Sequence, residues 1–347
     1  MNYHQLGSTG VKIPRIIFGT SCLGNLYRAL PEERKRDILS ECFKHMPRPV
    51  VLDSAGKYGA GLALEVIGRN LRELDISAQD VLISNKLGWL RAPLKTPEPM
   101  FEPGVWQDLQ YDAKQNISYD GILECWEQGN ELLGAEYKPA MLSVHDPDEY
   151  LAAANNDAER QKRFNDIIEA YRVLSDLKGR GQTQAIGVGA KDWTVIREIS
   201  RHIELDWVML AVSFTVYSHP PELLEFMDEL AGKGAGIINS AVFHAGFLTG
   251  GEFFDYRIPD PDNPEDKQLF LWREKFFTVC KEFGIPPAIV CVQFGLSHPG
   301  VLAVALNTGK PERIKNNIDS VLTNVPPGLW DRLKQEGLIK KDFTFPA

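Results

Sequence analysis

Residues 50–58 read Val50-Val51-Leu52-Asp53-Ser54-Ala55-Gly56-Lys57-Tyr58. Three consecutive apolar residues that end at an acidic residue and a glycine-containing loop are typical of a parallel strand buried on both faces. An amphipathic stretch over residues 61–74 follows and predicts a helix. A strand, a loop and a helix in this order form the repeating unit of α/β folds.

The same unit recurs along the whole chain. Apolar runs lie at residues 16–18, 50–52, 81–83, 141–144, 185–188, 208–212, 236–238 and 301–306. Helical stretches alternate with them: one opens at Pro31, and others span residues 61–74, 118–133, 164–178, 192–201, 221–231, 270–283 and 311–322. This alternation predicts an α/β fold, a (β/α)8 TIM barrel that forms a single domain over residues 1–347. An open doubly wound sheet would alternate similarly, but no GxGxxG fingerprint follows the first strand.

Three segments lie outside the repeat. Residues 7–10, Gly-Ser-Thr-Gly, predict a hairpin turn before the barrel. Residues 90–116, with four prolines, and residues 250–266 predict long loop insertions. Because these insertions follow the third and seventh strands, we expect both at the carboxyl ends of the strands, where barrel active sites lie.

The composition restricts the class of protein. The chain of 347 residues has 38 Lys and Arg against 47 Asp and Glu, a net charge of −9. This balance argues against a nucleic acid or an anionic membrane as partner, since both require a basic patch. The sequence predicts neither a membrane-spanning segment nor a secretory signal. Five scattered cysteines without a CxxC pair predict reduced thiols in a cytoplasmic protein, and no metal site.

Reactive side chains follow three neighbouring predicted strands. Asp53, Lys86 and His145 follow the second, third and fourth strands, and Tyr58 lies in the loop after Asp53. Each residue alone is common in a structural role, but the end groups of adjacent barrel strands converge. The pKa of a phenol is about 10, and a nearby ammonium group lowers it. The four residues therefore predict a proton-transfer site for a carbonyl and alcohol pair.

At these residues the sequence resembles the aldo-keto reductase family. The matching stretches, in family order, are residues 6–14, 18–20, 53–59, 64–68, 84–86, 144–146, 186–189, 246–250 and 309–314. The resemblance implies an NAD(P)-dependent oxidoreductase in which Tyr58 is the acid or base, Asp53 and Lys86 tune it, and His145 orients the substrate. Residues 119–123 and 145–148 are similar to the branch of L-fucose, L-galactose and D-threo-aldose 1-dehydrogenases, which also includes a pyridoxal dehydrogenase.

The resemblance also implies the cofactor contacts. They are Gly19, Thr20 and Ser21 near the nicotinamide ribose, and Thr308, Gly309, Lys310, Arg313 and Asn317 around the adenosine. The chain departs from the family at Ala190-Lys191, where a Ser-Asn pair usually holds the carboxamide, and near Ser240, where an aromatic ring is usual. The branch resemblance favours NAD, although Lys310 and Arg313 would suit the 2′-phosphate of NADP.

We therefore expect oxidation of an aldose at C1 to its lactone. Tyr27 and Trp89 follow the first and third strands and are expected to wall the pocket for this small-molecule substrate. The alternatives are an NADPH-dependent aldehyde or ketone reductase and a pyridoxal dehydrogenase. More remote are an aldolase that uses Lys86 as a Schiff base and a non-catalytic, redox-sensing subunit of a larger complex.

Overall fold

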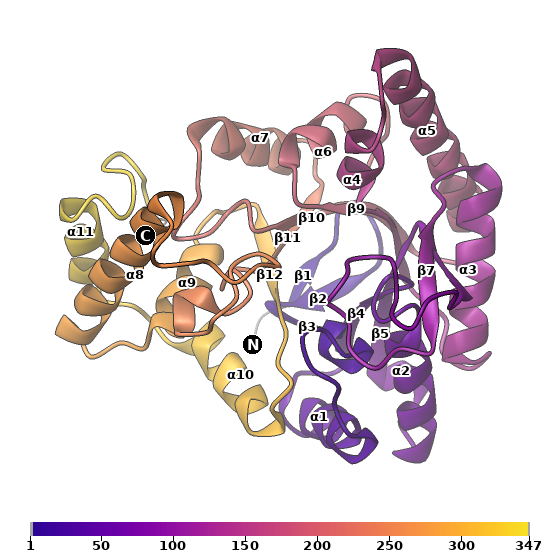
Figure 1. The fold of residues 1–347 in the computed structure, drawn as a ribbon, viewed down its shortest axis with the longest axis horizontal. Coiled ribbons are helices and arrows are strands. Elements are labelled where there is room, and N and C mark those ends of the chain that lie inside the picture. The colour runs from indigo at the N-terminus through magenta and orange to yellow at the C-terminus, as the bar shows by residue number, and fades with distance from the viewer. Residues whose placement is uncertain (1–2, 346–347) are drawn as a thin grey trace.

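Eight parallel strands form a closed barrel at the centre of the computed structural model, which describes residues 3–345 (Figure 1). In chain order these strands are β3 (Ile16–Gly19), β4 (Val50–Ala55), β5 (Val81–Leu87), β8 (Met141–His145), β9 (Ala185–Ala190), β10 (Trp207–Ala211), β11 (Gly236–Ser240) and β12 (Val301–Leu306). Each pairs in parallel with the next, and β12 pairs with β3 to close the barrel. The predicted (β/α)8 fold is confirmed, and each predicted apolar run overlaps one barrel strand.

Helices surround the barrel (Figure 1). They are α1 (Glu32–His45), α2 (Leu62–Glu73), α3 (Tyr119–Leu133), α4 (Pro147–Ala152), α5 (Asp157–Gly179), α6 (Trp193–Ile199), α7 (Pro221–Gly232), α8 (Pro264–Glu282), α9 (Pro287–Gly295), α10 (Ile314–Leu322) and α11 (Pro327–Gln335), with the 3-10 helices η1 (Ser21–Gly24), η2 (Ala78–Asp80), η3 (Phe247–Thr249) and η4 (Pro311–Arg313). Capping side chains mark several starts: Ser118 accepts the N–H of Gly121 in α3, for example. The sequence did not predict α4, α9 or α11. Within residues 3–345, no single helix combines the length and apolar composition needed to cross a membrane.

The amino-terminal hairpin closes one end of the barrel. β1 (Tyr3–Gln5) and β2 (Lys12–Pro14) pair antiparallel around the turn predicted at residues 7–10. Leu6 and Ile13 are fully buried in a cluster with Trp207, the first residue of β10. Gly187 leaves room for that indole, because a Cβ there would lie 2.5 Å from the Trp207 ring. With the amino end filled, the carboxyl end of the barrel is the face left for a ligand.

The two insertions meet over that carboxyl end. The first is a hairpin rather than an irregular loop, since β6 (Trp89–Pro93) and β7 (Tyr111–Gln115) pair antiparallel. In the connection between them, the Val105 carbonyl accepts the Tyr27 N–H at 2.8 Å. In the second insertion, Phe253 stacks on Tyr27 with ring centroids 4.4 Å apart. Both insertions therefore frame the same opening, as the sequence predicted.

Candidate active site

The four predicted catalytic residues project from neighbouring strands. Asp53 lies in β4, Lys86 in β5 and His145 at the end of β8, while Tyr58 lies in the loop between β4 and α2. β4 pairs with β5, and β5 pairs with β8. Asp53, Lys86 and His145 are all buried. The structure brings the four residues together, and their roles stay predictions.

Lys86 and Asp53 form a buried ion pair beneath Tyr58. Asp53 also accepts the hydroxyl of Ser84 at 3.0 Å. The Lys86 ammonium lies 4.7 Å from the centre of the Tyr58 ring. Because the carboxylate compensates the buried ammonium charge, Lys86 presents a fixed cation to the phenol.

The pKa of Tyr58 is raised well above 10, which corrects the expectation that Lys86 lowers it. Burial is the largest cause, followed by the carboxylates of Asp53 and Asp146, whereas the ammonium of Lys57 acts in the opposite direction. The net direction differs from the expectation because burial dominates, Asp53 balances the charge of Lys86, and further carboxylates lie close by. At neutral pH Tyr58 is therefore a neutral phenol, which can donate a proton and becomes a base only at alkaline pH.

His145 lies edge-on to Tyr58, with ring centroids 5.7 Å apart. Burial, and then the ammonium groups of Lys86 and Lys57, lower the pKa of His145 well below 6.5. The imidazole is therefore neutral at physiological pH. A neutral imidazole carries one N–H, which can donate a hydrogen bond to a substrate oxygen.

A cavity of about 660 Å³ opens beside these four side chains. Its volume falls within the range of about 300–1,000 Å³ for small-molecule and cofactor sites. Close to Tyr58 the wall is aromatic and acidic, and includes Tyr27, Glu102, Trp106, Asp146 and Tyr256. The other end is lined by residues of η1, of the loop after β12 and of α10. The cavity therefore reaches from the predicted catalytic residues to the predicted adenosine contacts.

Two predicted contacts do not reach this cavity. Trp89 is buried in a small cluster with Phe101 and Trp106, and of these two tryptophans only Trp106, from the hairpin connection, lines the cavity. Thr20 is fully buried, and its hydroxyl donates to the Asp53 carbonyl at 2.9 Å. Thr20 therefore joins the ends of β3 and β4, and its contact with the cofactor stays a prediction.

Comparison with known sequences assigns the chain to a family. Residues 15–336 match the model of the aldo/keto reductase family. The chain belongs to this family. It is accordingly an NAD(P)-dependent oxidoreductase, as the motifs predicted.

Relatives of this aldo/keto reductase cover nearly its whole length. Pyridoxal 4-dehydrogenase of Microbacterium luteolum is 26% identical, over 96% of this chain and 97% of that protein. D-threo-aldose 1-dehydrogenase of a Pseudomonas species is 24% identical, over 96% of each. A probable voltage-gated potassium channel subunit beta of Arabidopsis thaliana is 33% identical, over 96% of each. The structure of a glycerol dehydrogenase from Gluconobacter oxydans superposes with a TM-score of 0.70 at 15% identity, over 99% of each chain, which supports the fold.

The far end of the cavity fits the adenosine and phosphate groups of NAD(P). The predicted contacts that line the cavity are Gly19, Ser21, Thr308, Gly309, Lys310, Arg313 and Asn317. η4 and α10 begin at this end, and helix starts after the last barrel strand favour phosphate groups. Arg28 and Arg34 also line the cavity, and Arg34 comes from α1, which packs against η4 and α10. The acidic lining residues come from β4, the β6–β7 connection, the end of β8 and the second insertion, next to Tyr58 and Tyr27.

The middle of the cavity departs from the family pattern, as the sequence predicted. Ala190 lines it without a polar side chain. The ammonium of Lys191 is held by Glu149 at 2.5 Å and lies 4.7 Å from the centre of the Tyr256 ring. The hydroxyl of Ser240 donates to the Leu210 carbonyl at 3.3 Å. These side chains do not offer the Ser-Asn pair or the aromatic ring that the family resemblance implies at these positions.

Sequence reasoning missed several lining residues: Arg28, Arg34, Lys57, Glu102, Asp146 and Tyr256. Lys57 and Asp146 directly adjoin predicted catalytic residues, so their positions alone could have drawn attention to them. Glu102 and Tyr256 belong to the insertions at residues 90–116 and 250–266. The sequence placed those insertions near the site, but it could not show which of their side chains turn inward.

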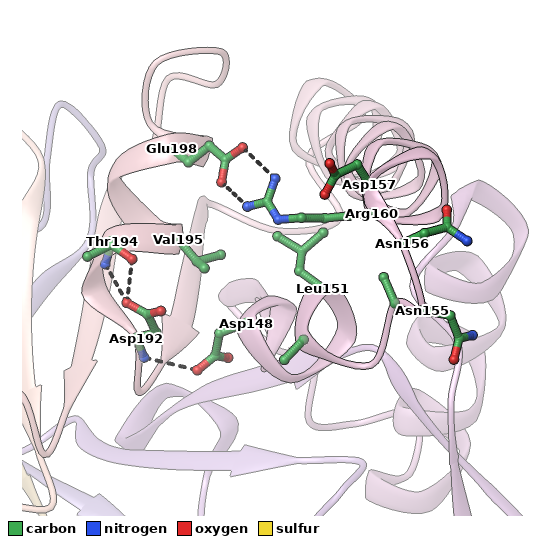
Figure 2. A pocket seen from close by; sticks show the side chains of 12 residues that line it. Asp148, Leu151, Asn155, Asn156, Asp157, Arg160, Asp192, Thr194, Val195 and Glu198 are labelled. Atoms are coloured by element: carbon green, nitrogen blue, oxygen red, sulfur yellow. Dashed lines mark hydrogen bonds and ion pairs between the residues drawn. The ribbon is translucent and has the colours of Figure 1, made fainter.

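A second hollow, of about 410 Å³, lies between α4, α5 and α6 (Figure 2). Its charged groups largely satisfy one another. Arg160 donates to both carboxylate oxygens of Glu198, at 3.2 and 2.6 Å, and Asp148 accepts the backbone N–H of Asp192 at 2.9 Å. Among the described residues, no three His, Cys, Asp or Glu side chains are grouped to hold a metal ion. The cavity at the barrel end, which holds the predicted catalytic residues, is thus the candidate active site.

Proposed function

We propose that this aldo/keto reductase oxidises an aldose at C1 to the corresponding lactone. The observation that carries the proposal is the convergence of Asp53, Tyr58, Lys86 and His145 at one end of a cavity whose wall there is acidic and aromatic. Similarity to D-threo-aldose 1-dehydrogenase supports the same substrate class. L-Fucose and L-galactose are the sugars to test first.

In the proposed reaction Tyr58 is the base. Its phenolate takes the proton of the C1 hydroxyl, C1 gives up a hydride, and the C1–O bond becomes the carbonyl of the lactone. Bound oxidised nicotinamide supplies the hydride acceptor and a positive charge that favours the phenolate. Lys86, held by Asp53, supports the same ionised form, and the neutral His145 donates a hydrogen bond to the substrate oxygen.

The wall beside Tyr58 supports a polyhydroxylated substrate. The carboxylates of Glu102 and Asp146 are paired with Lys57, and because a carboxylate has about four acceptor sites, each can also accept a hydrogen bond from a sugar hydroxyl. Trp106 and Tyr27 add broad rings that suit the C–H face of a sugar.

For the cofactor we propose NADP in preference to NAD, against the preference drawn from the branch resemblance. Arg34, from the helix α1 that packs against η4 and α10, adds a cation to the predicted pair of Lys310 and Arg313. Guanidinium groups bind phosphate oxygens in a paired geometry. A carboxylate, which binds the ribose 2′-hydroxyl in many NAD sites, is not among the lining residues at this end.

Arg34→Ala and Arg313→Ala should each raise KM for NADP more than KM for NAD. A higher kcat/KM of the parent enzyme with NAD than with NADP would overturn this cofactor choice.

The central experiment measures initial rates at 340 nm with L-fucose, L-galactose, pyridoxal and glycerol, with NAD and NADP supplied separately. We expect an aldose to give the highest kcat/KM. Tyr58→Phe should lower turnover by about 10²–10⁴-fold and leave cofactor affinity unchanged. Faster turnover of pyridoxal or glycerol than of any aldose would refute the substrate class, and an active Tyr58→Phe variant would refute the base.

Pyridoxal oxidation is the second candidate, because pyridoxal 4-dehydrogenase is 26% identical over nearly the full length. An aldolase role for Lys86 is disfavoured, since a Schiff base requires a free amine and the Lys86 nitrogen is buried in an ion pair with Asp53. A redox-sensing subunit, to which the likeness to a channel subunit points, would bind cofactor tightly and turn over no substrate of the panel.

A further inference from the structure

One buried ammonium group at the mouth of the cavity binds three carboxylates. The Nζ of Lys57 lies 2.7 Å from Asp146 Oδ2, 2.8 Å from Glu102 Oε1 and 2.9 Å from Glu149 Oε2. The Lys57 side chain is only 4% exposed. A cation this deeply buried requires compensating charge, and these carboxylates hold the pKa of Lys57 above its usual value.

The three ion pairs join separate parts of the site. Lys57 directly precedes Tyr58, and Asp146 directly follows His145, so two of the partners adjoin predicted catalytic residues. Glu102 comes from the connection of the β6–β7 hairpin. Lys57 therefore links the loop after β4, the end of β8 and the first insertion.

Glu102 extends this link to the substrate side of the cavity. Its second oxygen, Oε2, accepts the indole N–H of Trp106 at 2.7 Å. The Trp106 ring lies 6.0 Å from the Tyr58 ring, centre to centre, and both line the cavity. The chain of contacts from Lys57 through Glu102 to Trp106 thus sets the distance between the aromatic wall and the predicted base.

We propose that Lys57 is a positioning residue that determines how tightly the sugar binds, by holding Trp106 and the hairpin connection against Tyr58 and His145. The inference rests on the proposed function for the identity of the substrate. It assigns Lys57 no contact with the reacting atoms. The cofactor phosphates belong to the opposite end of the cavity, so Lys57 should not affect cofactor affinity.

The test is the steady-state kinetics of Lys57→Met with the best substrate of the panel. Loss of the link should raise KM for the substrate by about tenfold or more, because small displacements around a reacting group cost up to about a hundredfold. The dissociation constant of NADP, measured by calorimetry, should not change. Lys57→Arg, which keeps the charge, should recover part of the affinity. Lys233→Met is the matched control, because Lys233 is exposed and paired with Glu229 far from the cavity, and its KM should equal that of the parent.

A double-mutant cycle with Glu102→Gln separates positioning from general stability. If Lys57 acts through Glu102, adding Lys57→Met to Glu102→Gln should change KM by no more than about twofold, because the two substitutions break the same link. Full additivity of the two effects on KM would overturn the proposal. So would a Lys57→Met variant whose KM equals that of the parent.

Two further outcomes keep the result interpretable. If Lys57→Met does not fold, Glu102→Gln alone carries the test, and an unchanged KM in that variant overturns the proposal. If the parent oxidises no aldose, the proposed function fails by itself. The Lys57 inference is then decided with whichever carbonyl or alcohol substrate the enzyme turns over.

Discussion

Two buried lysines lie beside Tyr58, and carboxylates compensate them differently. Lys86, inside the barrel, meets the single carboxylate of Asp53. Lys57, at the mouth, meets three carboxylates. The first arrangement is a neutral pair, whereas the second leaves an excess of negative charge. Even with Lys191, which shares Glu149, two ammonium groups face three carboxylates.

This difference, together with burial, accounts for the raised pKa of Tyr58. Lys86 is the cation nearest to the Tyr58 ring, yet the raised pKa of Tyr58 reflects burial first and then Asp53 and Asp146. The carboxylate of Asp53 offsets part of the stabilisation that Lys86 gives to a neighbouring phenolate, and the unbalanced carboxylates at the mouth oppose the phenolate further. The residues around Lys57 thus influence the predicted base in addition to the strand residue Asp53.

The largest expected effect comes from breaking the neutral pair. Lys86→Met should lower kcat for sugar oxidation by about 10²–10⁴-fold, because it removes the cation beside the proposed base. It should also lower the free energy of unfolding by about 3–5 kcal/mol, since Asp53 is left buried without a cation. Steady-state kinetics and urea denaturation measure the two effects separately.

The double variant Lys86→Met/Asp53→Asn is the matched control for this prediction. It removes the stranded charge, so stability should largely recover while kcat stays low. Recovery of kcat along with stability would show that Lys86 matters only for the fold. The comparison with Lys57 would then be wrong, because both lysines would act through structure alone.

The second prediction concerns the pH dependence of oxidation, which should shift in opposite directions when Glu102 or Lys57 is replaced. An acid with a raised pKa keeps its proton to higher pH, so oxidation by the Tyr58 phenolate should accelerate from neutral to alkaline pH. The charged and titratable groups around Tyr58 are Asp53, Lys86, His145, Asp146, Lys57, Glu102 and Tyr256. Removing the negative charge of Glu102 should move the rise in rate to lower pH, and removing the positive charge of Lys57 should move it to higher pH.

Profiles of kcat/KM against pH for Glu102→Gln and Lys57→Gln test these signs. The shifts should be smaller than the loss caused by Lys86→Met, because each variant alters one charge among several. Shifts in the same direction, or an oxidation rate highest at acidic pH, would contradict the assignment of Tyr58 as a base with a raised pKa.

The barrel could be predicted from sequence because each buried strand is a short apolar run followed by a polar residue. α9 was missed because its sequence, residues 287–295, is apolar almost throughout and shows no amphipathic period. α4 is only six residues long. The first insertion was predicted as a loop because prolines interrupt it, yet its ends at β6 and β7 pair as a hairpin.

In the candidate site, too, some residues could be predicted from the sequence and others could not. Asp53, Lys86 and His145 could be located because barrel topology alone brings strand ends together. Glu102 and Tyr256 could not, since the path of a long insertion depends on contacts such as the stacking of Phe253 on Tyr27. The raised pKa of Tyr58 reflects burial first and then Asp53 and Asp146, and the burial depends on how the insertions pack, which strand-end reasoning did not reach.

The smallest expected effect separates the two tryptophans near Lys57. The Trp89 ring centre lies 4.6 Å from the Lys57 ammonium, and its indole N–H is buried without a partner among the described residues. Trp89→Phe keeps an aromatic face towards the ammonium and removes an unsatisfied donor, so the free energy of unfolding should change by no more than about 1 kcal/mol. KM of this variant for the sugar should match that of the parent.

Trp106→Phe, in contrast, loses the hydrogen bond to Glu102 within the cavity wall and should raise KM severalfold. Steady-state kinetics of both variants show which tryptophan contacts the substrate. A larger rise in KM for Trp89→Phe than for Trp106→Phe would mean that Trp89 forms the substrate wall. Lys57 would then not act through Glu102.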